Sequence, residues 1–209
     1  MDIVLISQII IVCLLGAISP GPSMVVVINN AITKSRVNGI ITAIAHGIGI
    51  TLYALFAVLG IGLIIQTSSF IFNGLQILSI VFLFYLGVQS LRNTDEIDFE
   101  GTSVKSGGTS FAQGFAISIL NPKIFIWFVA IYSQFMSIDN NLTLNATLVI
   151  TAGIVDTLWY ILLVYLVTTG MIFELIKSNY RFIHRFIGIL FVILSYNFLT
   201  LLENRLKHS

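Results

Sequence analysis

Six long apolar segments constrain the fold of this chain more than any other feature of its sequence. They cover about residues 3–31, 39–65, 70–90, 113–136, 144–170 and 184–202. A helix needs roughly 20 apolar residues to cross a bilayer, and helices satisfy their own backbone polar groups in lipid. Only 9% of the 209 residues are charged, against about 25% in a soluble domain. The sequence therefore predicts an all-α integral membrane protein with six transmembrane helices.

The links between these segments differ in charge, which predicts the topology. Lysine and arginine follow the first, third and fifth segments, at Lys34, Arg36, Arg92, Lys105, Lys177, Arg181 and Arg185. The links at 66–69 and 137–143 contain neither residue. Because positive residues stay on the cytoplasmic side, both termini are expected outside. Arg205 and Lys207, near the C-terminus, count against this orientation.

The first segment is preceded only by Met1 and Asp2, neither of which has a basic side chain. A secretory signal peptide needs a positively charged start, so this segment is expected to be a retained membrane helix. The link at 91–112 is acidic and rich in glycine and is expected to be a flexible cytoplasmic linker. It divides one membrane domain into a first half, 1–90, and a second half, 113–209.

The two halves show signs of an internal repeat. Gly47 to Tyr53 reads GIGITLY and Gly153 to Trp159 reads GIVDTLW. These motifs fall in the second helix of each half. Since three helices is an odd number, the second half would be inverted relative to the first. The sequence therefore predicts a 3+3 inverted repeat, an arrangement common in secondary transporters.

Proline interrupts the first helix of each half, at SPGP in AISPGPSM and at NPK in SILNPKIF. Proline in a helix interior removes a hydrogen-bond donor and costs roughly 3 kcal/mol or more. Interrupted helices at corresponding positions point to a binding site in the middle of the membrane, where helix N-termini attract carboxylates. A plain kink for packing is the alternative. The residues predicted here to contact the substrate are Ser19, Pro20, Gly21, Pro22, Ser23, Asn121 and Pro122.

Three ionisable residues lie inside the apolar segments: His46, Lys123 and Asp156. The helical rise of 1.5 Å per residue places them at about the same depth. Lys123 and Asp156 are expected to face one another. They would either bind the carboxylate and ammonium groups of a zwitterion or form a static pair, since a single buried charge is costly.

His46 and Asp156 are candidates for proton coupling, because the unperturbed pKa of histidine lies near 6.5; a packing role for His46 is the alternative. Trp159 would either pack on the substrate or fill the core.

At these residues the sequence resembles the LysE/RhtB family of amino-acid exporters. The similarity is strongest in SPGPSMVVV and GFAISILNPKIFIWFVAIYSQF, and it covers nearly the whole chain. The resemblance implies six helices, a bacterial inner membrane location and amino-acid efflux driven by the proton motive force. It maps the family's two motifs onto Ser19 to Pro22 and Asn121 to Lys123. Ser23 departs from the family's usual Asn or Asp, and a homodimer is implied by analogy only.

Other functions fit the sequence less well. Thiol-disulfide chemistry needs paired cysteines, but Cys13 is the single cysteine, and neither an HExxH nor a serine nucleophile motif is present. We therefore expect neither an enzyme nor a cofactor. A metal-cation exporter of similar fold is the alternative transporter. Metals prefer clustered carboxylates, thiols or imidazoles, and one Asp, one His and a nearby Lys make a poor site, so we expect no bound metal. No basic run suggests a nucleic-acid partner; the expected partners are an amino acid and the lipid bilayer.

Overall fold

The computed structural model describes residues 3–92, 108–136, 142–169 and 178–208. Apart from short connections, these residues are helical and contain no strand. The elements are α1 (Ile3–Ile18), α2 (Pro22–Asn29), a π-helical turn η1 (Asn30–Lys34), α3 (Arg36–Thr67), α4 (Ser69–Arg92), α5 (Ser110–Leu120), α6 (Pro122–Phe135), α7 (Leu142–Thr168) and α9 (Tyr180–His208).

Four of these helices, α3, α4, α7 and α9, are each long and apolar enough to cross a membrane. Two bent pairs can each form one further span. The pair at Ile3–Ile18 and Pro22–Lys34 bends by 69°, and the pair at Ser110–Leu120 and Lys123–Phe135 bends by 56°. With both pairs counted, the described residues contain up to six spans. The prediction of an all-α, multi-pass membrane protein is confirmed.

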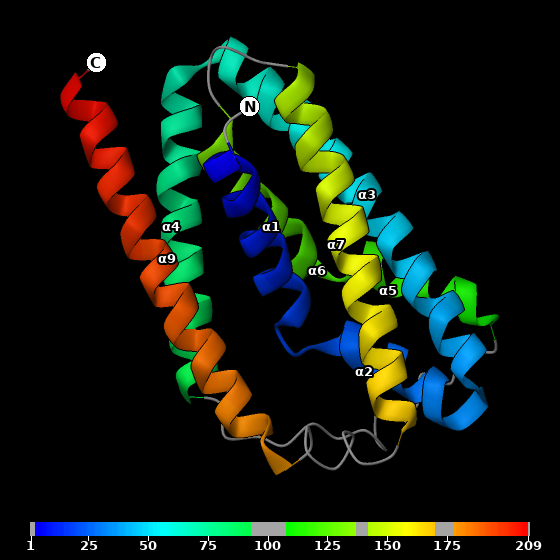
Figure 1. The fold of residues 1–209 in the computed structure, drawn as a ribbon. Coiled ribbons are helices and arrows are strands. Elements are labelled where there is room, and N and C mark those ends of the chain that lie inside the picture. The colour runs from blue at the N-terminus through cyan, green and yellow to red at the C-terminus, as the bar shows by residue number, and fades with distance from the viewer. Residues whose placement is uncertain (1–2, 93–107, 137–141, 170–177, 209) are drawn as a thin grey trace.

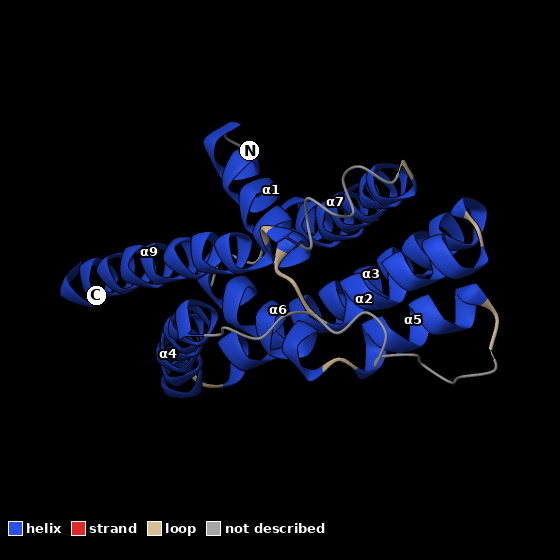
Figure 2. Ribbon diagram, turned by 90° about the horizontal axis from the view of Figure 1, so that it is seen from below, coloured by secondary structure: helices blue, strands red, loops and turns tan. Residues whose placement is uncertain are grey.

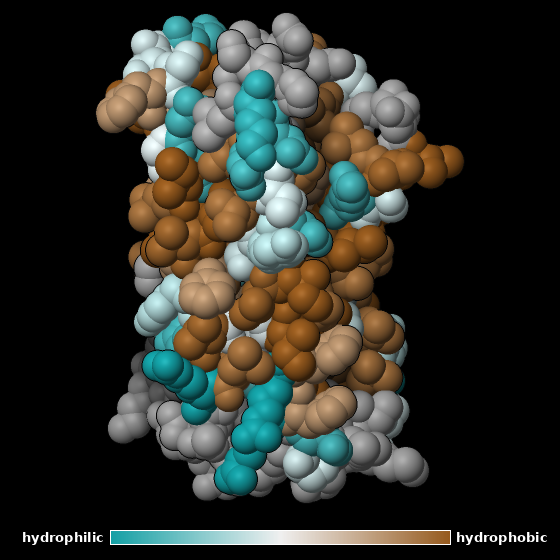
Figure 3. Space-filling model, turned by 90° about the vertical axis from the view of Figure 1, so that its left-hand side faces the viewer, coloured by the Kyte–Doolittle hydropathy of each residue, from teal (hydrophilic) through white to brown (hydrophobic). Residues whose placement is uncertain are grey.

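The exposed surface of the helices is apolar, as a lipid-facing surface must be. Large hydrophobic side chains such as Phe70, Leu78 and Phe182 are mostly exposed. Figure 3 shows hydrophobic residues over much of the middle of one face, with hydrophilic residues more frequent toward both ends. In water such a surface would be unfavourable, so the pattern requires a bilayer around the protein.

The helices pack in pairs that join the two predicted halves. The pairs α3 with α7, α3 with α5 and α4 with α9 make the most extensive contacts. Figure 2 shows α6 in the middle of the molecule, between the α4–α9 pair and α3. Both chain ends lie at one end of the bundle, and the beginning of α9 and the ends of α4 and α7 lie at the other (Figure 1).

Glycines allow the close approach of α3 to α7 and of α4 to α9. A Cβ on Gly47 would lie 1.8 Å from Thr157 Oγ1, and one on Gly188 would lie 2.8 Å from the carbonyl oxygen of Gly87. Small residues let transmembrane helices approach until their backbones touch. Helices α3 and α7 carry the matching GIGITLY and GIVDTLW motifs, and α4 and α9 are the third helices of the two predicted halves. The 3+3 inverted repeat itself stays a prediction.

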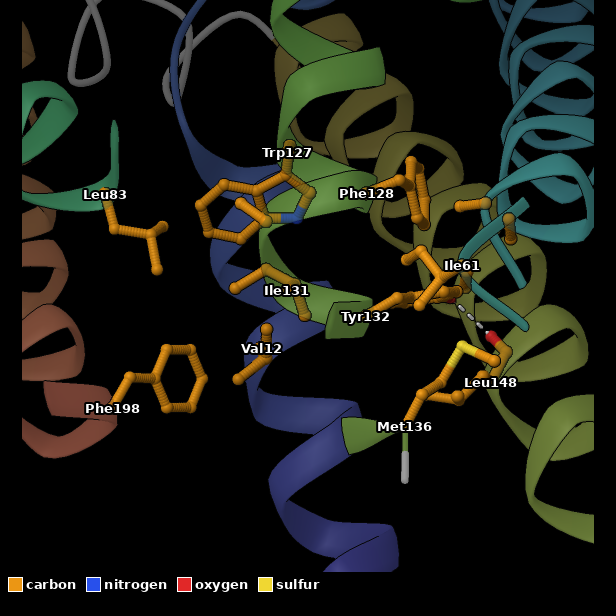
Figure 4. Packing of buried hydrophobic residues seen from close by; sticks show 14 of the residues in the cluster. Val12, Ile61, Leu83, Trp127, Phe128, Ile131, Tyr132, Met136, Leu148 and Phe198 are labelled. Atoms are coloured by element: carbon orange, nitrogen blue, oxygen red, sulfur yellow. Dashed lines mark hydrogen bonds between the residues drawn. The ribbon is translucent and has the colours of Figure 1, made fainter. Parts of the chain in front are cut away.

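Two hydrophobic clusters of described residues fill the space between the helices. The first lies between α1, α3, α4, α6, α7 and α9 and includes Val12, Tyr132 and Leu148 (Figure 4). There the Tyr132 hydroxyl donates a hydrogen bond of 2.7 Å to the carbonyl oxygen of Leu148, so α6 is tied to α7. The second cluster includes Met24, Val27, Tyr160 and Leu163 and joins α2, α3 and α7. The predicted ionisable residues His46, Lys123 and Asp156 line a space between the two clusters.

Most of the basic residues that were used to predict the topology lie in the part of the chain that the structure describes. Lys34, Arg36, Arg92, Arg181 and Arg185 are all exposed and belong to helix ends at the end of the bundle opposite the termini. Lys105, Lys177 and residues 93–107 of the predicted linker lie outside the described residues. The division into 1–90, 91–112 and 113–209 therefore stays a prediction, and so does the side of the membrane on which the termini lie.

Candidate functional site

A cavity lies where the two bent helix pairs meet, between the two hydrophobic clusters. It holds about 600 Å³ of space, including the open space at its mouth. Helices α1, α2, α3, α6 and α7 contribute to its wall. The lining residues are Cys13, Gly16, Ala17, Ser19, Gly21, Ser23, His46, Ile50, Asn121, Lys123, Ile124, Trp127, Phe128, Ala152, Asp156 and Tyr160.

Local sequence explains why both helices restart at this cavity. Pro22 is the first residue of α2 and Pro122 the first of α6, the position where a missing N–H costs nothing. Asn121 caps α6, because its Oδ1 accepts a 3.0 Å hydrogen bond from the backbone N–H of Lys123. The same side chain donates through Nδ2 to Ser23 Oγ at 3.4 Å. Asn121 therefore links the two breaks directly.

Lys123 places its ammonium group against the first break. Its Nζ donates to Ser19 Oγ at 2.6 Å and to the carbonyl oxygen of Pro20 at 3.4 Å. The interrupted helix therefore supplies acceptors for a cation, in addition to the N–H donors that the sequence predicted. The Tyr53 hydroxyl bonds the carbonyl oxygen of Ile119, near the second break. Backbone groups released by the breaks thus find partners inside the protein, as a lipid environment requires.

Asp156 pairs with His46 across the interface of α7 and α3. Asp156 Oδ2 lies 2.7 Å from His46 Nδ1, and the two residues are only 5% and 1% exposed. Lys123 and Asp156 therefore do not form the static pair that was one of the two alternatives from the sequence, although both residues line the same cavity. The reason is the close approach of α3 and α7, which brings His46 directly against Asp156 while Lys123 reaches Ser19.

His46 has one unused nitrogen. Its Nε2 is buried and has no hydrogen-bond partner among the described residues. The ring makes an edge-to-face contact with Tyr160, with centroids 4.9 Å apart and planes at 70°. A buried polar atom without a partner is costly, so Nε2 is a candidate hydrogen-bond partner for a ligand in the cavity that His46 lines.

The structure brings together seven of the predicted site residues: Ser19, Gly21, Ser23, His46, Asn121, Lys123 and Asp156 all line the cavity. Pro20 is buried and contributes its carbonyl oxygen, whereas Pro22 is exposed. The side chain of Pro122 lies outside what the structure describes. Trp159 does not line the cavity; it packs beside the second hydrophobic cluster, and its neighbour Tyr160 lines the wall instead.

The wall residues that the sequence analysis missed could have been found by helical spacing. Residues four positions apart share one face of a helix. Ile50 is four residues after His46, Trp127 is four after Lys123, and Ala152 and Tyr160 flank Asp156 at the same distance. Gly16 gives the wall its shape, because a Cβ there would lie 2.5 Å from the indole nitrogen of Trp127.

The cavity offers a substrate one cation, one carboxylate and an apolar wall. Lys123 can receive a carboxylate, and the beginning of α2 at Gly21 and Ser23 faces the same space. Asp156 can receive an ammonium group. Among the described residues, no group of three His, Cys, Asp or Glu side chains could hold a metal ion.

Comparisons with known proteins identify relatives of this chain. The sequence model of the family described as LysE type translocator matches residues 14–201. An uncharacterized membrane protein, YrhP, of Bacillus subtilis (strain 168) is 29% identical over 163 residues, 72% of this chain and 77% of that protein. The threonine efflux protein of Escherichia coli (strain K12) is 27% identical over 153 residues, which cover 70% and 74% of the two chains.

A leucine efflux protein of Salmonella choleraesuis (strain SC-B67) is 27% identical over 123 residues, 57% of each chain. No solved structure shows a significant match.

Proposed function

The chain belongs to the LysE type translocator family, and from this premise we propose that it is a secondary transporter that exports amino acids across the bacterial inner membrane. The single observation that carries the proposal is the pair of opposite charges in one cavity. Lys123 and Asp156 both line the space between the broken helices. The α-carboxylate and α-ammonium groups of an amino acid carry the matching charges.

We propose that the carboxylate binds at Lys123 and at the N-terminal end of α2. Lys123 Nζ is already held by Ser19 Oγ at 2.6 Å, so the cation is positioned before the substrate arrives. Positioned donors lose little conformational entropy on binding. The first backbone N–H groups of α2 add to the attraction, because helix N-termini carry partial positive charge.

The ammonium group of the substrate is proposed to bind at Asp156. The remaining wall, formed by residues such as Ile50, Trp127 and Phe128, would then contact the side chain. Within the described lining, no second carboxylate faces this apolar wall. Amino acids with uncharged side chains, or close derivatives of them, are therefore the favoured substrates. The relatives named for threonine and leucine efflux agree with this assignment.

The proton motive force is the proposed driving force for export, and His46 and Asp156 are the proposed coupling residues. Both are buried, they touch one another, and they line the substrate cavity. We further propose that both termini lie outside, and a homodimer remains a prediction by family analogy. A metal-cation exporter is the weaker alternative, since the family's named relatives export amino acids.

Counterflow in proteoliposomes tests the proposal. Vesicles containing the purified protein are loaded with one unlabelled amino acid, and uptake of the labelled amino acid is followed across a panel that includes divalent cations. We expect exchange of neutral amino acids, and its loss in Lys123→Met but not in the exposed control Lys207→Met. Exchange of a divalent cation without exchange of any amino acid would reject the proposal.

A further inference from the structure

We propose that the exposed face of the α4–α9 pair binds an anionic phospholipid, whose phosphate lies against Arg92 and Arg185 and whose acyl chain ends in an apolar groove between the two helices. This site is separate from the amino-acid cavity, because none of the described residues that line the cavity belongs to α4 or α9. The proposal therefore does not depend on which substrate is transported.

The groove lies between the middle parts of α4 and α9. It holds about 800 Å³ of space, including the open space at its mouth. Ile80 and Ser195 are buried at its base, and the Ser195 hydroxyl is already used, because it donates to the carbonyl oxygen of Val192 at 2.7 Å. The groove therefore suits a hydrocarbon chain, which gains dispersion contacts there. Its walls are formed by three residues of each helix: Ile77, Val81, Phe84, Val192, Tyr196 and Leu199.

Two arginines lie on the same side of the two helices as the groove. Arg92 follows Val81 by eleven residues, and Arg185 precedes Tyr196 by eleven. Eleven residues are close to three helical turns, so each arginine lies above a groove residue of its own helix. Val81 and Tyr196 are 57% and 65% exposed, and both arginines are exposed as well. Neither arginine has a carboxylate partner among the described residues.

The two arginines also lie near one another across the helix pair. Helix α4 ends and α9 begins at the same end of the bundle (Figure 1). A Cβ on Gly188, three residues after Arg185, would lie 3.0 Å from Cγ of Leu91, which directly precedes Arg92. One phosphate group can therefore be reached from both helices, and a guanidinium binds phosphate through paired, charge-assisted hydrogen bonds.

The distance from the arginines to the groove matches one leaflet of a bilayer. Eleven residues of helix rise by about 16 Å, and half of the hydrocarbon core is about 15 Å thick. A lipid whose phosphate is bound at the arginines therefore has an acyl chain that reaches the groove. Tyr85 and Ile189 are exposed and provide apolar surface between the two. Figure 3 looks onto this side of the molecule, where hydrophobic residues cover the middle and hydrophilic residues are found at the lower end.

A second copy of the chain is the alternative occupant of the groove, and the charges disfavour it. A two-fold dimer with its axis along the membrane normal places the same surface of both copies in contact. Arg92 and Arg185 would then lie at the same level as their counterparts in the other copy, and like charges repel. An anionic lipid neutralises both arginines instead.

Native mass spectrometry of the detergent-solubilised protein with added lipid tests the proposal. The probes are phosphatidylglycerol and phosphatidylethanolamine with identical long acyl chains, so that they differ in head-group charge. A basic residue at the membrane surface contributes about fivefold to the binding of an anionic lipid, so two arginines should favour phosphatidylglycerol by roughly 25-fold. Equal binding of the two lipids would overturn the proposal.

Substitution of both arginines locates the head group. Arg92→Gln combined with Arg185→Gln should abolish the preference for phosphatidylglycerol. The matched control is Lys34→Gln combined with Arg36→Gln, which removes two positive charges from the same end of the bundle but from η1 and α3, and which should keep the preference. An equal loss in both double variants would indicate general attraction to positive charge and would reject the site.

Filling the groove locates the acyl chain. Val81→Trp should weaken the binding of long-chain phosphatidylglycerol several-fold, and it should leave a short-chain form unaffected, because the short chain does not reach the groove. The control is Leu78→Trp, since Leu78 is exposed on the same helix but lies outside the groove lining. Unchanged binding of the long-chain lipid by Val81→Trp would overturn the proposal. A lipid-free dimer that Val81→Trp converts to a monomer would assign the groove to a second copy and would also reject the lipid site.

Discussion

Gly47 of α3 and Thr157 of α7 lie so close that a Cβ on the glycine would fall 1.8 Å from the threonine Oγ1. A second contact exchanges the roles of the two helices: a Cβ on Gly153 of α7 would fall 2.0 Å from Thr51 Oγ1 of α3. The four residues occupy equivalent places in the GIGITLY and GIVDTLW motifs. Such an exchange of contacts is what a two-fold relation between the helices produces, and it holds His46 against Asp156.

Substitution of Gly47 should therefore destabilise the protein. Gly47→Ala forces the two helices apart or displaces Thr157, and overpacking of this kind costs about 1–3 kcal/mol. Thermal unfolding in detergent measures the effect. The control is Gly60→Ala on the same helix, where a Cβ meets nothing within 4 Å and the better helix propensity of alanine should be neutral or stabilising. Equal stability of the two variants would contradict this packing.

Removal of the Lys123 charge should weaken substrate binding while the fold is kept. Lys123→Met preserves the length of the side chain but loses the charged donor to Ser19 and to a substrate carboxylate. A hydrogen bond to a charged group contributes about 1.5–3 kcal/mol, which corresponds to roughly 10–150-fold in affinity. Isothermal titration with a transported amino acid measures the loss. An unchanged dissociation constant would remove Lys123 from the site.

Asp156→Asn should fold and fail to transport. The amide is isosteric with the carboxylate, and its oxygen can still accept a hydrogen bond from His46 Nδ1. The ammonium group of the substrate, however, loses its counter-charge. We expect a normal elution profile in size-exclusion chromatography together with loss of counterflow. A variant that aggregates as well as losing transport would instead indicate that the pair with His46 is chiefly structural.

The Tyr132 hydroxyl should stabilise the bundle through its bond to α7. In Tyr132→Phe the buried carbonyl oxygen of Leu148 loses its 2.7 Å donor, and the expected loss is about 0.5–1.5 kcal/mol. Thermal unfolding in detergent again gives the readout. Tyr196→Phe is the matched control, because Tyr196 is 65% exposed and its substitution should leave the unfolding temperature unchanged.

Both termini should be accessible from outside the cell. Cys13 is the single cysteine, so Cys13→Ala gives a background without thiols. In that background Lys207→Cys should react with an impermeant maleimide in intact cells, whereas Lys34→Cys should react only after the membrane is permeabilised. The reverse pattern of labelling would invert the predicted topology.

The sequence alone predicted the all-α membrane fold and the depth in the membrane at which the ionisable residues lie. Apolar segments of the length of a bilayer leave a chain little choice but helices, and SPGP and NPK place interruptions in the first helix of each half. The constant rise per residue also fixes depth, which is why His46, Lys123 and Asp156 could be assigned to one level. All three line the cavity in the structure.

The partner of each charge was decided only by the tertiary structure. Depth along a helix follows from counting residues, but the direction in which a side chain points depends on how each helix is rotated against its neighbours. The glycine contacts between α3 and α7 bring His46 to Asp156, the bend after α1 brings Ser19 to Lys123, and the same rotation of α7 turns Tyr160 rather than Trp159 into the cavity. These relations arise between segments more than 100 residues apart, and sequence periodicity within a single helix carries no information about them.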